Sequence, residues 1–340
     1  MKKININGFE VGGNNTYIIA DVGSNHMQDL QLAKESIAAA KEAGVDAVKF
    51  QSIQLNELYL NPDKVTADFV KQLEFPEKWH FELKDYADKV GITFFSSPTY
   101  LKAVDILEEI NVPVYKLASA QVGTFPQMVD RVASLNKPTI FSTGIAAINE
   151  IEHAVSIFRK YNNDQFIILH CNSIYPTPAE RVNLPLMQHL AEKYPDNPVG
   201  FSDHTIGTHT ACAAVTMGAK VIEKHFTLDR NFKSPDSNVF ASDPTELALL
   251  VKQIRDIERS LVAISDRVEI EQEEKEFKNA ILYKIVAARD IGMNETVSNS
   301  NIKFLRAKDG IDCNKVDTII GKKLKLAIKQ NELIIYEQLA

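Results

Sequence analysis

The stretch TYIIADVGSNHMQDLQLAKESIAAAKEAGVDAVKFQ, from Thr16 to Gln51, contains the pattern that decides the fold. Residues 16–22 are rich in β-branched and aromatic residues, which predicts a strand. Residues 29–44 follow with apolar residues at helical spacing and end in a glycine, which predicts a helix with a glycine stop. Residues 45–51 predict a second strand. Strand, helix and strand in this order indicate a parallel sheet.

The same alternation continues to Leu261. Eight strand–helix pairs in about 260 residues are typical of a (β/α)₈ TIM barrel, so we predict an α/β fold of that kind rather than an open doubly wound sheet. No GxGxxG or GxxxxGK[ST] motif follows a strand, which weakens the nucleotide-binding alternative. The six further strands are predicted at residues 92–97, 113–119, 137–144, 165–171, 197–203 and 219–225.

A second, smaller domain is predicted after the barrel. Residues 1–265 would form the barrel, and the highly charged residues 266–283 would form a linker. Residues 284–340 contain short strand-like runs and few helical signals. A domain of this size has a marginal core by itself, so we expect it to dock on the barrel or on a partner.

The composition excludes several classes of protein. A net charge of −7 argues against a nucleic-acid partner. No apolar run is long enough for a membrane span, and the N-terminal lysines are not followed by the apolar core of a signal peptide. Cys171, Cys212 and Cys313 are scattered, which predicts a cytoplasmic protein without disulfides or a structural zinc site.

Polar side chains stand at the C-terminal end of every predicted strand. In a parallel barrel these ends meet at one mouth, where active sites form. A single serine there has a simpler alternative as a turn or a helix cap, but eight polar ends together favour an active site. The groups are Asp21, Asn25, His26, Lys49, Gln51, Ser96, Ser97, Lys116, Ser119, Gln121, Ser142, Thr143, Asn172, Ser173, Tyr175, Ser202, Asp203, His204, Glu223 and His225.

Two of these strand ends predict an anion site. Lys49 and Gln51 are two residues apart on a strand and therefore point to the same face. A lysine among hydroxyls and helix N-termini suits a phosphate. Lys116 could add a second positive charge, and its alternative is a lysine that extends to the surface.

His204 and His225 end two consecutive predicted strands, which lie side by side in a barrel. Two imidazoles so placed could share one divalent metal and leave its other positions open. The alternative is that each is a hydrogen-bonded structural group. Asp203 or Glu223 could orient the rings.

These residues carry a resemblance to a known family. The motifs IIADVGSNH, DAVKFQ, YKLAS, FSTG, HCNSIYPTP, GFSDHT and EKHFTLD follow in the order and at about the spacing of the sialic acid synthase family, also called N-acetylneuraminate or nonulosonate synthases. The chain resembles that family over essentially its whole length. Its segment IKFLRAKDG, residues 302–310, is similar to the family's C-terminal antifreeze-like (SAF, β-clip-like) domain.

The resemblance implies a cytoplasmic transferase that condenses phosphoenolpyruvate with N-acetylmannosamine or a related N-acylated amino sugar and releases phosphate. It implies a divalent metal on His204 and His225, most often Mn²⁺, with Mg²⁺ or Co²⁺ as alternatives. It also implies a domain-swapped homodimer, and no nucleic-acid or membrane partner. The residues implied for phosphoenolpyruvate are Lys49, Ser97, Lys116, Ser119, Ser142, Ser173 and Ser202. Those implied for the sugar are Gln51, Gln121, Tyr175, Asp236 and, from the partner's small domain, Arg306.

The chain departs from the family's pattern near the predicted sugar. The family has glutamate at the positions of Asp21 and Gln121, its usual HCTNIYP reads HCNSIYP here, and SPDSN replaces a GPD loop. These changes leave the identity of the sugar open. Asp21 is then the predicted catalytic base, because Gln121 cannot titrate.

Two alternatives remain open at this point. Another phosphoenolpyruvate–sugar condensing synthase would act on a sugar phosphate and need more arginines than this mouth shows. A non-catalytic sugar-binding or regulatory protein on a degenerate barrel is favoured by Gln121, whereas Lys49 and the histidine pair argue against it.

Overall fold

The computed structural model describes residues 1–232, 234, 239–262 and 269–340. The chain divides into two compact units, Met1–Val262 and Ala263–Ala340, and each is described here by itself. The domain and linker boundaries predicted from the sequence stay predictions.

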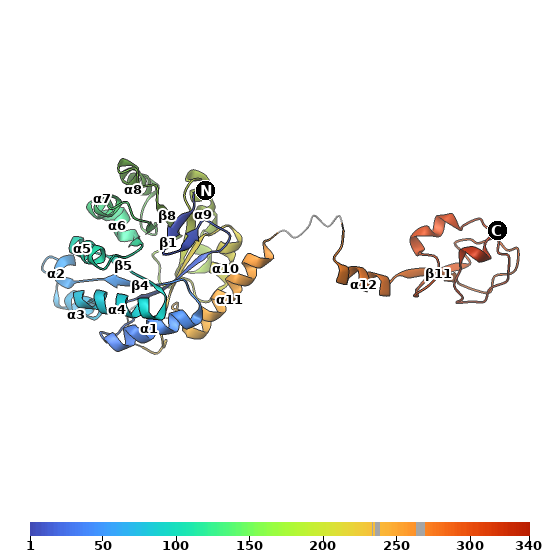
Figure 1. Ribbon diagram of the computed structural model, residues 1–340, viewed down its shortest axis with the longest axis horizontal. Coiled ribbons are helices and arrows are strands. Elements are labelled where there is room, and N and C mark those ends of the chain that lie inside the picture. Colours follow the sequence, from blue (N-terminus) through green and yellow to red (C-terminus); the bar gives the residue numbers. More distant parts are fainter. Residues whose placement is uncertain (233, 235–238, 263–268) are drawn as a thin grey trace. The chain divides into compact units, whose positions relative to one another are not determined.

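The first unit contains a nearly closed barrel of eight parallel strands (Figure 1). Hydrogen bonds join the strands in the order β5-β4-β3-β10-β9-β8-β7-β6. The two outer strands of this order also contact each other, and the Ser97 hydroxyl donates to the Lys116 carbonyl oxygen across them at 3.1 Å. The predicted (β/α)₈ TIM-type fold is therefore confirmed. The strands are β3 Tyr17–Gly23, β4 Ala47–Ser52, β5 Thr93–Pro98, β6 Tyr115–Leu117, β7 Thr139–Ser142, β8 Phe166–Cys171, β9 Val199–Asp203 and β10 Val221–His225.

Helices surround the strands, and neighbours such as α1 and α4 or α10 and α11 contact each other around the outside (Figure 1). The first helix shows why the predicted ends hold. Asp29 accepts hydrogen bonds from the amides of Gln31 and Leu32, and Gly44 ends the helix at φ 87°. The helices are α1 Leu30–Ala43, α2 Leu55–Leu58, α3 Lys64–Leu73, α4 Glu77–Val90, α5 Leu101–Glu109, α6 Ser119–Thr124, α7 Pro126–Ala133, α8 Ile148–Lys160, the 3₁₀ turn η1 Ala179–Arg181, α9 Leu184–Lys193, α10 His209–Thr216 and α11 Pro244–Ser260.

An antiparallel hairpin precedes the barrel. Its strands β1 Ile4–Ile6 and β2 Phe9–Val11 pair through a turn at Asn7 and Gly8, both at positive φ. The Phe9 ring contacts the Tyr17 ring, with centroids 5.0 Å apart, at the start of β3. The hairpin therefore packs at the N-terminal end of the strands and leaves the opposite end free for the site.

The second unit has a small apolar core of its own. Helix α12 Gln272–Ala280 comes first, and strands β11 Tyr283–Ala287 and β12 Ile302–Arg306 pair antiparallel. Two 3₁₀ turns follow, η2 Cys313–Thr318 and η3 Tyr336–Gln338. No helix among the described residues of the whole chain is both long and apolar enough to span a bilayer. The core of this unit contains Ile285, Ala287, Ile291, Val297, Ile302, Ile311, Ile319, Leu324, Ile328, Ile334 and Leu339.

Candidate active site

A small cavity of about 50 Å³ lies at the C-terminal ends of the barrel strands. Period-two alternation turns every second residue of each strand toward the barrel axis, and near the C-terminal ends many of these residues are polar, as the sequence predicted. Most of the predicted site residues are brought together here. The lining is Asp21, Lys49, Gln51, Lys116, Ala118, Ser119, Ser142, Cys171, Tyr175, Ser202, His204, Glu223 and His225.

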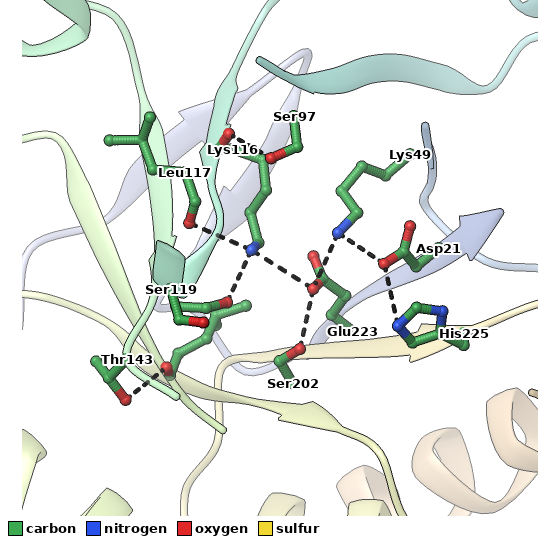
Figure 2. A network of polar contacts seen from close by, with 12 residues as sticks. Asp21, Lys49, Ser97, Lys116, Leu117, Ser119, Thr143, Ser202, Glu223 and His225 are labelled. Carbon is green, nitrogen blue, oxygen red and sulfur yellow. Dashed lines mark hydrogen bonds and ion pairs between the residues drawn. The ribbon is translucent and has the colours of Figure 1, made fainter. Parts of the chain in front are cut away.

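Glu223 is the centre of a buried charge network and lies between the ammonium groups of Lys49 and Lys116 (Figure 2). Its Oε1 is 3.1 Å from Lys49 Nζ and 3.5 Å from Lys116 Nζ, and it accepts a hydrogen bond from Ser202 Oγ at 2.9 Å. Asp21 Oδ2 lies 2.8 Å from the other side of Lys49 Nζ. Two cations and two carboxylates therefore share one buried site.

The two carboxylates of this network titrate differently. Burial would raise the pKa of Glu223, but Lys116 and Lys49 outweigh it and hold that pKa at about 2. Burial raises the pKa of Asp21 to about 6, because Lys49 offsets the penalty only in part and the Glu223 charge adds to it. Glu223 is thus a fixed anion, whereas Asp21 can exchange a proton near neutral pH.

The lysines respond to the same environment in opposite directions. Burial alone would lower the pKa of Lys49, but Asp21 and Glu223 outweigh it and raise that pKa. Burial lowers the pKa of Lys116, and the more distant Glu223 offsets this only in part. Lys116 is buried and points into the cavity, so the alternative of a surface lysine is wrong.

Hydroxyl groups gather on the Lys116 side of the cavity. Lys116 Nζ donates to Ser142 Oγ at 2.7 Å, and the hydroxyls of Ser119 and Ser173 are 3.3 Å apart. Gly144 has no side chain, which leaves space for the neighbouring side chains. A Cβ at this position would stand 2.4 Å from Ser173 Oγ and 2.8 Å from Cys171 Sγ. One ammonium group and three hydroxyls around a bare backbone segment suit a phosphate.

Gly144→Ala is expected to weaken phosphate binding roughly tenfold, about 1.5 kcal/mol, because the new methyl group displaces the Ser173 hydroxyl that supports Ser119 and crowds the Ser119 hydroxyl itself. Calorimetric titration with inorganic phosphate measures the change. Gly123→Ala is the matched control, since a Cβ there meets nothing closer than 3.6 Å. Equal affinity of the Gly144→Ala protein and the wild type would show that this segment does not touch the anion.

The two histidines face each other on the other side of the cavity. Their ring centroids are 5.2 Å apart, and the Tyr175 ring lies 4.3 Å from that of His204. His204 Nδ1 is 2.5 Å from the Asn172 carbonyl oxygen, which leaves Nε2 for another contact. Burial, and then the charge of His225, lower the pKa of His204 to about 3. The ring is therefore neutral at pH 7, which is the form that binds metals.

The donor chemistry around the histidines fits a divalent metal with open positions. His225 Nε2 is 3.6 Å from Asp21 Oδ2, and Asp21 Oδ1 is buried with no hydrogen-bond partner within the described ranges. Those ranges contain no group of three or more His, Cys, Asp or Glu side chains arranged to hold a metal. His204 and His225 could thus supply two ligands, with the remaining positions left to water or substrate.

Several predicted residues do not line the cavity. Ser97 lies just behind it, where its hydroxyl donates to the Lys116 carbonyl oxygen. Ser173 also lies behind it, with its hydroxyl next to that of Ser119. Gln121 is buried on α6. Asp236 lies outside the described residues, and Arg306 lies on β12 of the second unit, with its guanidinium 5.4 Å from the Tyr283 ring centroid.

Sequence reasoning missed two features of this site. Asp203 does not bond to the His204 ring, because it pairs with Lys224, and the Asn172 carbonyl oxygen bonds to that ring instead. Glu223 was considered only as a partner of the histidines, whereas it binds both lysines. Its position two residues before His225 on one strand was the available signal, since both must face the barrel axis.

Comparisons with known proteins agree in sequence and in fold. Residues 36–265 match the NeuB family. An uncharacterized protein of Methanocaldococcus jannaschii is 39% identical over 340 residues, 100% of this chain and 99% of its own length. The N,N'-diacetyllegionaminic acid synthase of Campylobacter jejuni is 36% identical over 335 residues, 94% of this chain and 98% of that enzyme. The crystal structure of N-acetylneuraminic acid (sialic acid) synthetase from Leptospira borgpetersenii, in complex with citrate, matches with a TM-score of 0.74 at 36% identity, over 82% of this chain and 97% of that one.

Proposed function

Because the chain belongs to the NeuB family, we propose that it condenses phosphoenolpyruvate with an N-acylated amino sugar, forming a nonulosonate and releasing phosphate. The observation that carries the proposal is the cavity itself. Lys49, Lys116 and a group of serine hydroxyls form its anion side, and the imidazoles of His204 and His225 face each other on the opposite side. Two substrates match that polarity, one with a phosphate on the lysine side and one with a carbonyl acceptor on the histidine side.

The anion side would hold phosphoenolpyruvate. Lys116, Ser119 and Ser142 would bind the phosphoryl oxygens, and Lys49 and Ser202 would bind the carboxylate or the bridging region. Ser97 and Ser173 would support this set from behind. The donors are already in place before the substrate arrives, so little reorganisation accompanies the reaction.

The reaction would proceed in two stages. The enol carbon of phosphoenolpyruvate attacks the aldehyde carbon of the open-chain sugar; the new carbon–carbon bond forms as the C=O double bond of the aldehyde opens and its oxygen takes up a proton to become a hydroxyl. Water then adds to the electron-poor carbon that bears the phosphate ester, and this adduct expels phosphate as the C–O bond breaks, the ketone of the product forms and the added hydroxyl gives up its proton. Asp21, whose pKa is raised by burial, would accept the proton of that water.

A divalent cation, most often Mn²⁺ in the sequence-based expectation, would be held by His204 and His225. When bound, it supplies Lewis-acid polarisation of the sugar aldehyde. The Asn172 carbonyl fixes the His204 ring through Nδ1, which keeps its other nitrogen turned toward the cavity.

The sugar side would involve Gln51 and Tyr175, which line the cavity, together with Gln121, Asp236 and Arg306. Arg306 would reach the site from the second unit of a partner chain, and that unit would act as an antifreeze-like domain in a domain-swapped homodimer. Asp21 has a shorter side chain than the glutamate it replaces. Gln121 lacks the negative charge of the glutamate it replaces, so the charge near the sugar is less negative. The proposal therefore names an amino-sugar class and leaves the acyl pattern to experiment.

The test uses the purified full-length chain with MnCl₂, phosphoenolpyruvate and a panel of N-acetylmannosamine and diacetamido-hexoses. Phosphate release that depends on one of these sugars, with a product of the matching mass, is the expected result. Release with sugar phosphates alone would favour the other class of condensing synthase. Sugar binding without phosphate release would favour a non-catalytic binding protein and contradict the proposal.

A further inference from the structure

Asp203 and Lys224 form an ion pair that the reaction described above does not use. Lys224 Nζ lies 2.9 Å from Asp203 Oδ2, and both side chains are fully buried. Lys224 also donates to the Thr205 carbonyl oxygen, and Asp203 Oδ1 accepts from the Thr205 amide at 2.8 Å. Neither residue lines the cavity. The pair therefore lies in the protein interior, away from any substrate.

The position of this pair in the two strands is specific. Asp203 on β9 and Lys224 on β10 are direct register partners. The rung before them pairs Ser202 with Glu223, whose side chains meet inside the barrel at 2.9 Å. Because side chains alternate between the two faces of a strand, the ion pair lies on the outer face directly behind the site. His204 and His225 follow on the inner face.

Each residue of the ion pair is the direct sequence neighbour of one of the two histidines. Asp203 immediately precedes His204, and Lys224 immediately precedes His225. The contacts to Thr205 also fix the backbone after His204, so that residue is held on both sides. The approach of β9 to β10 is close, since a Cβ at Gly200 would stand 2.3 Å from the Val221 carbonyl oxygen.

Stability alone is a weak reason for such a pair. Removing two charges from water opposes folding, and apolar residues of similar volume often serve as well or better. The best-attested role of buried ionic or polar groups is to select one register of two packed elements over the alternative registers. Here the register that is fixed carries the two imidazoles.

We propose that Asp203 and Lys224 are positioning residues for the metal site: their ion pair locks β9 to β10 behind the cavity and thereby sets the separation of His204 and His225. The inference rests on the proposed function, because it concerns the same two histidines. Neither residue touches substrate or metal. Groups that hydrogen-bond directly to metal ligands commonly change metal affinity by about 10- to 100-fold when altered, and an effect of the same order is expected for a pair that fixes the backbone beside both histidines.

The test compares wild type with the double variant Asp203→Asn/Lys224→Met, using the full-length chain. Asparagine keeps an acceptor for the Thr205 amide, and methionine keeps the volume of the lysine stem, so the change removes the charge pair and the Lys224 hydrogen bond to the Thr205 carbonyl oxygen. Free Mn²⁺ is measured by electron paramagnetic resonance to obtain the Mn²⁺ dissociation constant. Circular dichroism gives the melting temperature. The dissociation constant is expected to rise about 10- to 100-fold.

A matched control removes another ion pair that joins elements of the barrel. Glu108 and Lys137 pair at 2.7 Å, and Lys137 precedes β7, which places it at the opposite end of the strands. Glu108→Leu/Lys137→Met should leave the Mn²⁺ affinity at the wild-type value, even if the melting temperature falls. This comparison separates a loss of positioning from a general loss of stability.

The outcomes are distinguishable from failure of the proposed function. A wild-type chain that binds no Mn²⁺ and condenses no sugar contradicts the proposed function. A wild type that binds Mn²⁺ and a folded double variant with the same affinity overturn the positioning role alone. Should the double variant not fold, Lys224→Arg, which keeps both charges and alters the geometry of the bridge, is the second variant, and its Mn²⁺ dissociation constant is also expected to rise.

Discussion

His204→Ala or His225→Ala is expected to lower kcat/KM for condensation by about a thousandfold or more and to leave the fold intact. Each change removes one of the two imidazoles that would hold the cation, and a cation of this kind contributes several kcal/mol to stabilising charge in the transition state. Neither side chain belongs to the apolar core of the barrel. The measurements are phosphate release, Mn²⁺ affinity by electron paramagnetic resonance, and melting by circular dichroism.

His153→Ala is the control for this experiment, because His153 is exposed on α8, away from the cavity. It should retain wild-type activity and Mn²⁺ affinity. Full activity of the wild-type chain in a strong chelator would contradict the role given to the histidine pair.

Lys49→Ala should lower kcat/KM for phosphoenolpyruvate by roughly thirty- to a thousandfold. The loss corresponds to about 2–4 kcal/mol for one charge-assisted contact to an anion in a buried site. The structure adds a reason, because removal of Lys49 leaves Asp21 without its cation, 2.8 Å away, and takes one of two cations from Glu223. Uncompensated carboxylates would repel the incoming anion as well.

Steady-state kinetics with phosphoenolpyruvate varied measures this effect. Lys102→Ala is the control, since that lysine is exposed and pairs with Glu77 on the surface. An unchanged catalytic efficiency for Lys49→Ala would place the lysine outside the reaction. A melting temperature measured in parallel shows whether the variant is folded.

Much of the barrel could be predicted because its signals are local. Residues 16–51 carry strand, helix and strand patterns that do not depend on distant contacts. The hairpin was not predicted, although its Asn7–Gly8 turn is a strong hairpin signal, because its strands are only three residues long. Helices α2 and α3 were also missed, since they lie inside a connection between a strand and the next barrel helix.

The residues that form the candidate site could be predicted from the sequence, whereas many of the contacts between them could not. Period-two alternation was enough to place Lys49 and the histidines at the mouth. The sharing of Glu223 by two lysines depends on side chains that meet across a closed barrel, and no sequence spacing reports that distance. The pairing of Asp203 with Lys224 likewise needs the register of β9 against β10.

The carboxylate of Glu223, which lies between the two lysines, affects which anions can bind in the cavity. Glu223 already serves as an internal counter-ion for Lys49 and Lys116, so the cavity does not depend on dissolved salt for its charge balance. A singly charged ion such as chloride gains little binding energy from these lysines, because it must compete with the carboxylate of Glu223. That carboxylate belongs to the chain itself and also accepts a hydrogen bond from Ser202 Oγ. A multiply charged molecule that also uses the serine hydroxyls gains far more. The same carboxylate that weakens each lysine's attraction thus favours multiply charged molecules over singly charged ions in this cavity.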